Sequence, residues 1–197
     1  EHILAKEAER EKHSPIYTTE DVNAAMAKWE SVSYHKPFSI KPFDIEFYNA
    51  GHILGSAIIK ITAEDKTIVF SGDLGNYPAP IIQPTEKILD AADYCLVEST
   101  YGDRVHEEVS ERRGRLEDAI EDVVKRRGVL VIPAFAMERT QELLYHLNEL
   151  VEKGRVPKVP VFIDSPLAIK LTEVYSKYVS YFNPETKALV RSGDDIL

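Results

Sequence analysis

Residues 46–75 read EFYNAGHILGSAIIKITAEDKTIVFSGDLG, and residues 94–104 read YCLVESTYGDR. These stretches contain apolar, β-prone runs at 57–61, 67–70 and 94–97. Each run has the length and composition of a buried strand and is bounded by glycine or polar residues. The sequence therefore predicts a sheet in this region, and this sheet decides the fold.

A polar side chain of a metal-binding type adjoins each run. His52 precedes the first run, Asp73 follows the second, and Glu98 follows the third. Glycines flank His52 in GHILG and Asp73 in GDLG, and glycine permits the tight turns that such positions need. Because strand interiors are packed while strand ends open onto clefts, the pattern predicts a functional site built from strand ends.

These motifs resemble those of a known family. GHILGSA at 51–57 and FSGDLG at 70–75 resemble the third and fourth metal-ligand motifs of the metallo-β-lactamase fold. VESTYGDRVH at 97–106 resembles the first motif of the β-CASP branch, whose members are nucleases of RNA 3′-end processing, RNA decay and DNA repair. VIPAFAMERTQELLYHL at 131–147 and VPVFIDSPLA at 159–168 resemble stretches that follow this motif in β-CASP insertions.

The resemblance implies roles for the strand-end residues. His52 would ligate one of two zinc ions, and Asp73 would bridge both. Glu98 would act in catalysis by contacting a later histidine that assists protonation of the leaving group. Simpler readings stay open: Asp73 as the cap of its turn, His52 as a structural histidine, and Glu98 as a carboxylate satisfied by backbone N–H groups.

Other residues are candidates for substrate binding. Arg104 and Arg139 have the charge to face phosphates, and His106 follows Glu98 closely enough to line the same cleft. Ser165 stands at a strand-to-helix turn, where a hydroxyl or backbone N–H can bind an anion. A plain surface histidine is the alternative for His106.

The pattern changes after Arg104. Charged and apolar residues at helical spacing predict helices at 107–127, where Gly128 is expected at the left-handed position that ends the helix, and at 138–152 and 167–179. Short apolar runs predict strands at 129–132 and 159–163, between the helices. Strands alternating with helices are typical of a parallel, doubly wound α/β sheet.

Further elements are expected before Arg104. A helix is expected near the N-terminus at 1–12, and a second near 18–29 with Trp29 in the core. The alternation at 38–47 predicts a strand, and 85–92 a short helix. The predicted fold class is α/β. The resemblance implies that residues 1–102 form part of a metallo-β-lactamase αββα domain and that residues 103–197 form the first half of a parallel-sheet β-CASP domain.

Composition limits the function classes. The 44% apolar content suffices for a globular core, and the net charge of −9 argues against general nucleic-acid binding while leaving room for a local basic groove. The single cysteine, Cys95, lies in an apolar run, which predicts a buried thiol in a reducing cytoplasm. No apolar run approaches the ~18 residues of a membrane span.

The His-x-His-x-Asp-His motif that supplies most metallo-β-lactamase ligands does not occur here. The chain opens on Glu1 within a helical pattern and closes on Asp-Asp-Ile-Leu, so we expect an internal segment of a longer protein. Alone, it should be inactive and hold no stable zinc, whereas the parent should bind two zinc ions.

The leading hypothesis is a cytoplasmic, metal-dependent ribonuclease acting on single-stranded RNA, for which a homodimer stays open. Alternatives are a non-catalytic RNA-binding or scaffold subunit, a DNA-directed β-CASP nuclease, and a hydrolase of small esters. The helical and apolar segments after Arg104 argue against the small-ester hydrolase.

Overall fold

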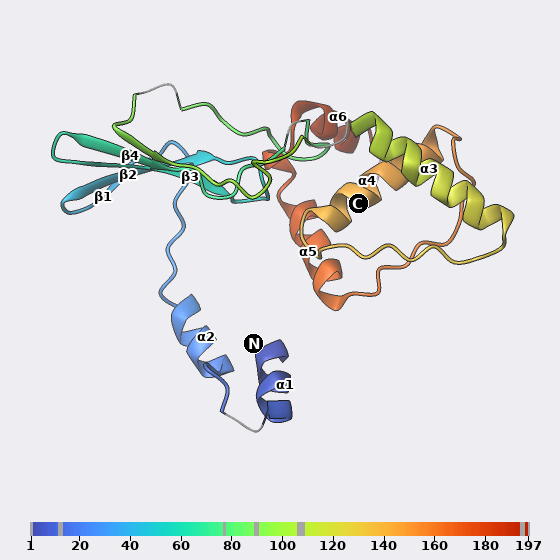
Figure 1. Ribbon diagram of the computed structural model, residues 1–197, viewed down its shortest axis with the longest axis horizontal. Helices are drawn as coiled ribbons and strands as arrows, with labels where there is room; N and C mark the ends of the chain where they lie inside the picture. Colours follow the sequence, from blue (N-terminus) through green and yellow to red (C-terminus); the bar gives the residue numbers. More distant parts are fainter. Residues whose placement is uncertain are drawn as a thin grey trace. The chain divides into compact units, whose positions relative to one another are not determined.

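The computed structural model describes residues 2–11, 14–76, 78–88, 91–105, 109–193 and 196. The chain divides into two compact units, Glu1–Ser33 and Tyr34–Leu197. The first unit contains two helices, and the second contains the sheet and the later helices (Figure 1). Among the residues described, no helix has the length and apolar character needed to cross a membrane.

The first unit contains the helices α1 (His2–Glu11) and α2 (Thr19–Met26), close to the two that the sequence predicts. Thr18 caps α2. Its Oγ1 accepts a hydrogen bond from the Asp21 amide at 3.4 Å, and the Asp21 carboxylate accepts one from the Thr18 amide at 2.8 Å. This reciprocal pair satisfies backbone donors at the helix start.

The prediction that Trp29 lies in the core is wrong. Its side chain is 76% exposed. Helix α2 ends at Met26, so the helical spacing that would place Trp29 on the same face does not continue to it. No residue of α2 is buried, so this helix has no core for Trp29 to join among the described residues.

The second unit is built on a five-stranded sheet with the order β1-β2-β3-β4-β5. Its strands are β1 (Phe38–Ile40), β2 (Phe43–Asn49), β3 (Ala57–Ala63), β4 (Lys66–Phe70) and β5 (Tyr94–Leu96). Strands β1 to β4 pair antiparallel, and β5 joins β4 in parallel. The strand expected at 38–47 is thus two strands, separated at Pro42, which has no N–H for a ladder.

Strands β3 and β4 belong to the sheet that the sequence predicts, and they form an antiparallel hairpin with Ile61 opposite Ile68. Ile58 and Val69 are buried together with Ala50, which lies just after β2. This small core places the ends of β2, β3 and β4 against one another, and the turns with His52 and Asp73 begin at these ends.

The helices of the second unit lie beyond one end of the sheet (Figure 1). They are α3 (Val109–Lys125), α4 (Arg139–Glu152), α5 (Pro166–Lys177), the 3₁₀ turn Val179–Tyr181 and α6 (Pro184–Ser192). The first three confirm the predicted helices. Helix α6 was not predicted, although Asn183 caps it by accepting a hydrogen bond from the Thr186 amide at 2.8 Å.

Helix α3 ends at Lys125, two residues earlier than predicted. Arg127, with φ of 53°, occupies the left-handed position expected for Gly128. The Gly128 amide donates to the Val123 carbonyl at 3.0 Å, which completes the helix-ending motif one residue later. In contrast, Gly154, with φ of 64°, takes the left-handed position that ends α4.

Residues 129–132 and 159–163 are not strands, contrary to the prediction. A strand needs a ladder partner, and within the described ranges neither segment pairs with another strand. Their apolar side chains are correspondingly open to solvent: Val129 is 86% exposed and Phe162 is 87% exposed. The doubly wound parallel sheet expected here is therefore not formed by the described residues.

Two further predictions differ from the structure. The described part of 85–92 is not helical, because the Glu86 amide donates to the Asn49 carbonyl at 3.0 Å and holds this segment along the end of β2. Cys95 is exposed rather than buried. It lies on the edge strand β5, where the neighbouring Tyr94 and Leu96 are also open to solvent.

A second core joins the loop after β4 to the helical part. Ile81, Ile82, Tyr175 and Phe182 are buried together. The loop is also bonded to the start of α6, since the Thr186 hydroxyl donates to the Pro80 carbonyl at 2.6 Å. The loop after β4 is therefore anchored to helices α5 and α6 by a core that is separate from the core of the sheet.

Candidate active site

The turn that carries His52 links β2 to β3. The Ser56 hydroxyl accepts hydrogen bonds from the backbone amides of His52 at 3.1 Å and Ile53 at 3.2 Å. The Asn49 side chain accepts one from the Gly51 amide at 2.9 Å, and Gly51 has a φ of 65°. The turn is thus fixed by its own side chains, and it leaves the His52 side chain exposed.

The turn that carries Asp73 packs directly against the His52 turn. The Gly75 amide donates to the Ala50 carbonyl at 2.9 Å. A Cβ at Gly75 would lie 1.6 Å from the Gly51 carbonyl oxygen and 2.8 Å from the His52 nitrogen. Only glycine permits this approach, so the spacing of GHILG and GDLG serves to bring the two turns together.

Glu98 follows β5 and reaches the Asp73 turn. Its Oε1 accepts a hydrogen bond from the Leu74 amide at 2.7 Å, and its own amide donates to the Ser71 hydroxyl at 3.0 Å. Hydrogen bonds from Thr100 and from the Leu74 amide hold the pKa of Glu98 below its ordinary value, and the charge of His52 contributes less. Glu98 is therefore an ionised carboxylate at neutral pH, within electrostatic reach of His52.

The structure thus brings the turns of His52, Asp73 and Glu98 together at one end of the sheet. Asp73 is exposed, and among the described residues no N–H or O–H group donates to its carboxylate, so it does not cap its own turn. Glu98 is satisfied by backbone and hydroxyl donors, as one of the simpler readings expected.

An exposed imidazole and an exposed carboxylate on adjoining turns fit two positions of a zinc ligand set. Within the described ranges, no group of three or more His, Cys, Asp or Glu side chains is arranged to hold a metal ion. A catalytic zinc ordinarily takes about three protein ligands, so His52 and Asp73 would hold such ions only with additional donors.

The expected substrate-binding residues do not gather at this site. Arg104 is exposed and pairs with Asp103 at 3.0 Å. Arg139 pairs with Glu142 at 2.9 Å on α4, and the Ser165 hydroxyl caps α5 by accepting from the Ala168 amide at 3.2 Å. His106 lies outside the described residues.

Sequence reasoning missed a polar pair between α4 and α5. The Tyr175 hydroxyl donates to Glu138 Oε2, while Glu138 Oε1 is shielded from solvent and has no hydrogen-bond partner among the described residues. Burial raises the pKa of Glu138 to about 7, against the opposing effect of the Tyr175 hydrogen bond; the charge of Glu142 adds to the rise, and that of Arg139 opposes it. The two residues are far apart in sequence, and no local pattern links them.

This pair predicts a pH dependence of stability that Glu138→Gln should remove. The pKa of Glu138 is higher in the folded protein than in the unfolded chain. The contribution of Glu138 to the free energy of unfolding is therefore fully present below about pH 4.5 and is lost as pH rises through about 7. The change amounts to at most about 3 kcal/mol. Urea unfolding at pH 5 and pH 8 measures the free energy of unfolding of both proteins. From pH 5 to pH 8 the wild type should lose stability relative to the variant. Glu185→Gln on α6 controls for loss of a surface carboxylate. If the stability of Glu138→Gln changed with pH as much as that of the wild type, Glu138 would not be the cause of the pH dependence.

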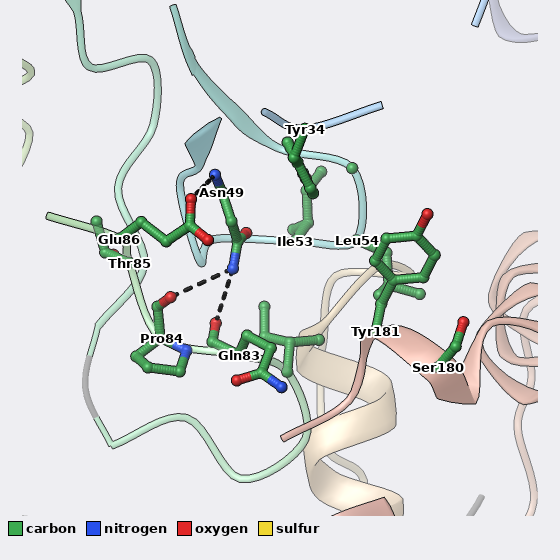
Figure 2. Close-up of a pocket in the computed structure, with 12 residues that line it drawn as sticks. Tyr34, Asn49, Ile53, Leu54, Gln83, Pro84, Thr85, Glu86, Ser180 and Tyr181 are labelled. Carbon is green, nitrogen blue, oxygen red and sulfur yellow. Dashed lines mark hydrogen bonds between the residues drawn. The ribbon is translucent and has the colours of Figure 1, made fainter. Parts of the chain in front are cut away.

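A pocket of about 260 Å³ opens beside the His52 turn (Figure 2). Its wall includes Tyr34, Leu54, Gln83, Glu86 and Tyr181. Glu86 is fixed there by the Asn49 amide, which donates to its Oε2 at 2.9 Å. The described residues lining the pocket include a carboxylate and no cationic side chain, so the pocket does not fit a phosphate group.

An α/β fold with metal-type side chains on glycine-bounded turns at strand ends fits the metallo-β-lactamase fold. Residues 140–196 match the family model of the Beta-Casp domain. The motifs of its first half stand in the order that β-CASP proteins of the metallo-β-lactamase fold have, so the chain is similar to this family along most of its length.

Curated relatives are similar over nearly the whole chain. The chain is 33% identical to Ribonuclease TTHA0252 of Thermus thermophilus, over 97% of this chain and 44% of the relative. It is 33% identical to an RNase J-like protein of Methanocaldococcus jannaschii, over 89% of this chain and 42% of the relative. It is 32% identical to cleavage and polyadenylation specificity factor subunit 3 of Dictyostelium discoideum, over 88% of this chain and 22% of the relative. The chain thus spans less than half the length of these relatives.

Proposed function

We propose that this chain forms part of a metal-dependent ribonuclease that hydrolyses phosphodiester bonds in single-stranded RNA. The observation that carries the proposal is the meeting of the His52, Asp73 and Glu98 turns at one end of the sheet. Relatives named as ribonucleases and endoribonucleases support RNA as the substrate class.

His52 and Asp73 are the proposed zinc ligands within the chain. Imidazole is a common ligand of zinc, and a carboxylate can bridge two ions while offsetting their charge. We assign His52 to one zinc ion and Asp73 to the position between two. The remaining ligands would come from parts of a protein of the relatives' length that lie outside this chain.

In the reaction, water adds to the phosphorus atom and the bond to the leaving oxygen breaks, so that oxygen must gain a proton. Bound zinc would supply an activated water and polarise the phosphoryl group. Glu98 is held by the Leu74 amide next to the Asp73 turn, and as a carboxylate it can orient a protonated histidine toward the leaving oxygen. We assign Glu98 this role in proton transfer.

Arg104, His106, Arg139 and Ser165 remain proposed contacts for the RNA backbone. Of the described residues among them, Arg104 is nearest in sequence to β5, the strand that leads to Glu98, and its side chain is 63% exposed. A partly free guanidinium there can pair with a phosphate. The exposed thiol of Cys95 fits a reducing compartment such as the cytoplasm.

We also place the boundary between the metallo-β-lactamase portion and the β-CASP portion near residue 102. The strands of the sheet all end before this point in the described residues, and α3 to α6 follow it. The Beta-Casp match at 140–196 lies wholly on the second side.

Cleavage by the full-length protein tests the proposal. We expect it to cut labelled single-stranded RNA, to lose this activity with a chelator, and to regain it with zinc. DNA of the same sequence serves as the second substrate, and the chain of 197 residues alone is the control that should neither retain zinc nor cleave. Binding of RNA without cleavage would favour a scaffold subunit, and cleavage of DNA alone a DNA nuclease; either outcome would contradict the proposal.

A further inference from the structure

The pocket beside the His52 turn has two tyrosines in its wall. Tyr34 precedes β1, and Tyr181 is the last residue of the 3₁₀ turn after α5. Their ring centroids lie 6.5 Å apart and their planes cross at 74°, so the edge of one ring meets the face of the other. Such a contact uses only one ring face, and Tyr181 is 47% exposed. The pair therefore leaves aromatic surface open to a further flat ring.

Hydrogen bonds fix the positions of the pocket walls. The Tyr34 hydroxyl donates to the Ser56 carbonyl at 2.8 Å. The Gln83 side chain donates at 2.8 Å to the carbonyl of Phe182, which is fully buried and directly follows Tyr181. Figure 2 shows Tyr34, Gln83 and Tyr181 around the pocket. A ligand therefore meets walls that the protein itself holds in place, and little affinity is lost to ordering them.

The pocket is joined to the candidate active site through Ser56. The Ser56 carbonyl accepts the bond from Tyr34, and the Ser56 hydroxyl accepts the bond from the His52 amide at 3.1 Å. Ile53 and Leu54, which follow His52 in the turn, form part of the pocket wall. A ligand in the pocket thus lies against the segment that carries His52, at a position that these bonds fix relative to the turn.

Charge and size narrow the choice of ligand. Among the described residues that line the pocket none is cationic, so a phosphate has no partner there. The carboxylate of Glu86 belongs to the frame of the pocket, since its Oε1 lies 3.1 Å from His35 Nε2 and its Oε2 accepts from the Asn49 amide at 2.9 Å. The volume of about 260 Å³ is below the range of about 300–1,000 Å³ typical of pockets for drug-sized molecules. The pocket therefore suits one uncharged, flat ring system rather than a whole nucleotide.

We propose that this pocket binds one unpaired nucleobase of the RNA, stacked on the ring of Tyr181 and bounded by Tyr34. Its ribose and phosphate stay outside, so the strand is held beside the His52 turn. Aromatic stacking tolerates any base, because every base has a π-face, so the pocket sets where the strand is held and not which sequence is chosen. That the base belongs to an RNA substrate rests on the proposed function, whereas the base site rests on the pocket.

The test couples loss of the Tyr181 ring to loss of one base. The full-length protein is prepared with Tyr181→Leu, which keeps apolar bulk without an aromatic face, and with Tyr181→Phe, which keeps the ring. Tyr94→Leu is the matched control, since Tyr94 is 60% exposed on β5 and does not line the pocket. The probes are labelled single-stranded RNAs of one sequence, each with a single abasic ribose at a different position. Binding is measured by fluorescence anisotropy with a chelator present, and cleavage of the same RNAs is measured with zinc.

We expect one abasic position to weaken binding to the wild type by about fivefold or more, the effect of losing one stack between a base and an aromatic ring. Tyr181→Leu should weaken binding of the intact RNA by a similar factor, and the same abasic position should then have no further effect. Tyr181→Phe and Tyr94→Leu should behave as the wild type. In the wild type, kcat/KM for cleavage should fall at the same abasic position.

Equal effects of every abasic position in Tyr181→Leu and in the wild type would overturn the proposal, because base and ring would then act independently. A coupled loss in a protein that binds RNA but does not cut it would keep the base site and refute the proposed ribonuclease. Cleavage of RNA without such coupling would keep the ribonuclease and refute the base site. The two failures are therefore distinguishable.

Discussion

Asp73→Ala should abolish RNA cleavage by the full-length protein while changing its RNA affinity by less than about fivefold, because affinity comes mainly from phosphate contacts elsewhere. Asp73 lies on a turn that touches the His52 turn through Gly75 and is exposed, without a structural partner among the described residues. Its removal costs the fold little and takes away the carboxylate that we propose to bridge two zinc ions. Without that bridge, the two ions would lose their common ligand, and cleavage would stop.

Asp65→Ala is the matched control for this variant. Asp65 is an exposed aspartate in the turn between β3 and β4, at the opposite end of those strands from Asp73. Cleavage rate, zinc content and RNA affinity are measured for both variants beside the wild type. Full activity in Asp73→Ala would remove Asp73 from the site, and a similar loss in both variants would point to a defect of the sheet.

Glu98→Gln should slow cleavage by about 10²- to 10⁴-fold, the range expected for general acid–base assistance, and leave the zinc content unchanged. Glutamine keeps an oxygen that can accept the hydrogen bond from the Leu74 amide, so the Asp73 turn should stay in place. The negative charge that the low pKa of Glu98 maintains at neutral pH is lost. The variant thus separates the proton-transfer role from a structural one.

Metal analysis of the purified variant decides between roles for Glu98. Glu86→Gln is the control, since Glu86 also accepts a hydrogen bond from a backbone amide, that of Asn49 at 2.9 Å. It should retain zinc and most of the activity. Loss of both zinc ions in Glu98→Gln would make Glu98 a ligand, contrary to the role assigned here.

The sheet could be predicted from the sequence because its signals are local. The apolar runs of β3 and β4 are separated by a polar turn, and this local pattern predicts a hairpin without information from the rest of the chain. The approach of the His52 turn to the Asp73 turn followed from the same pattern, since glycines flank both residues and strand ends meet at one edge. The contact of Glu98 with the Leu74 amide also agrees with the expectation that this carboxylate has a partner.

What could not be predicted depends on contacts between distant segments. The runs at 129–132 and 159–163 have strand composition, but composition cannot supply a ladder partner, and the described residues contain none for them. Cys95 has the neighbours of a buried residue, yet β5 lies at an edge and leaves it exposed. The hydrogen bond from Tyr175 to Glu138 joins two distant segments with no common motif.

The contact between Gly75 and Gly51 also limits how the sequence can diverge. Any side chain at position 75 would have to occupy the space of the Gly51 carbonyl, which lies 1.6 Å from where its Cβ would stand. Gly51 is confined as well, since a Cβ there would be 2.3 Å from the Thr85 nitrogen. Single substitutions at either position are thus blocked by main-chain atoms rather than by side chains that a second mutation can shorten. Random mutagenesis with selection for folding should therefore recover glycine at both positions, whereas Gly55, which has open space around it, can vary at the cost of its φ of 86°.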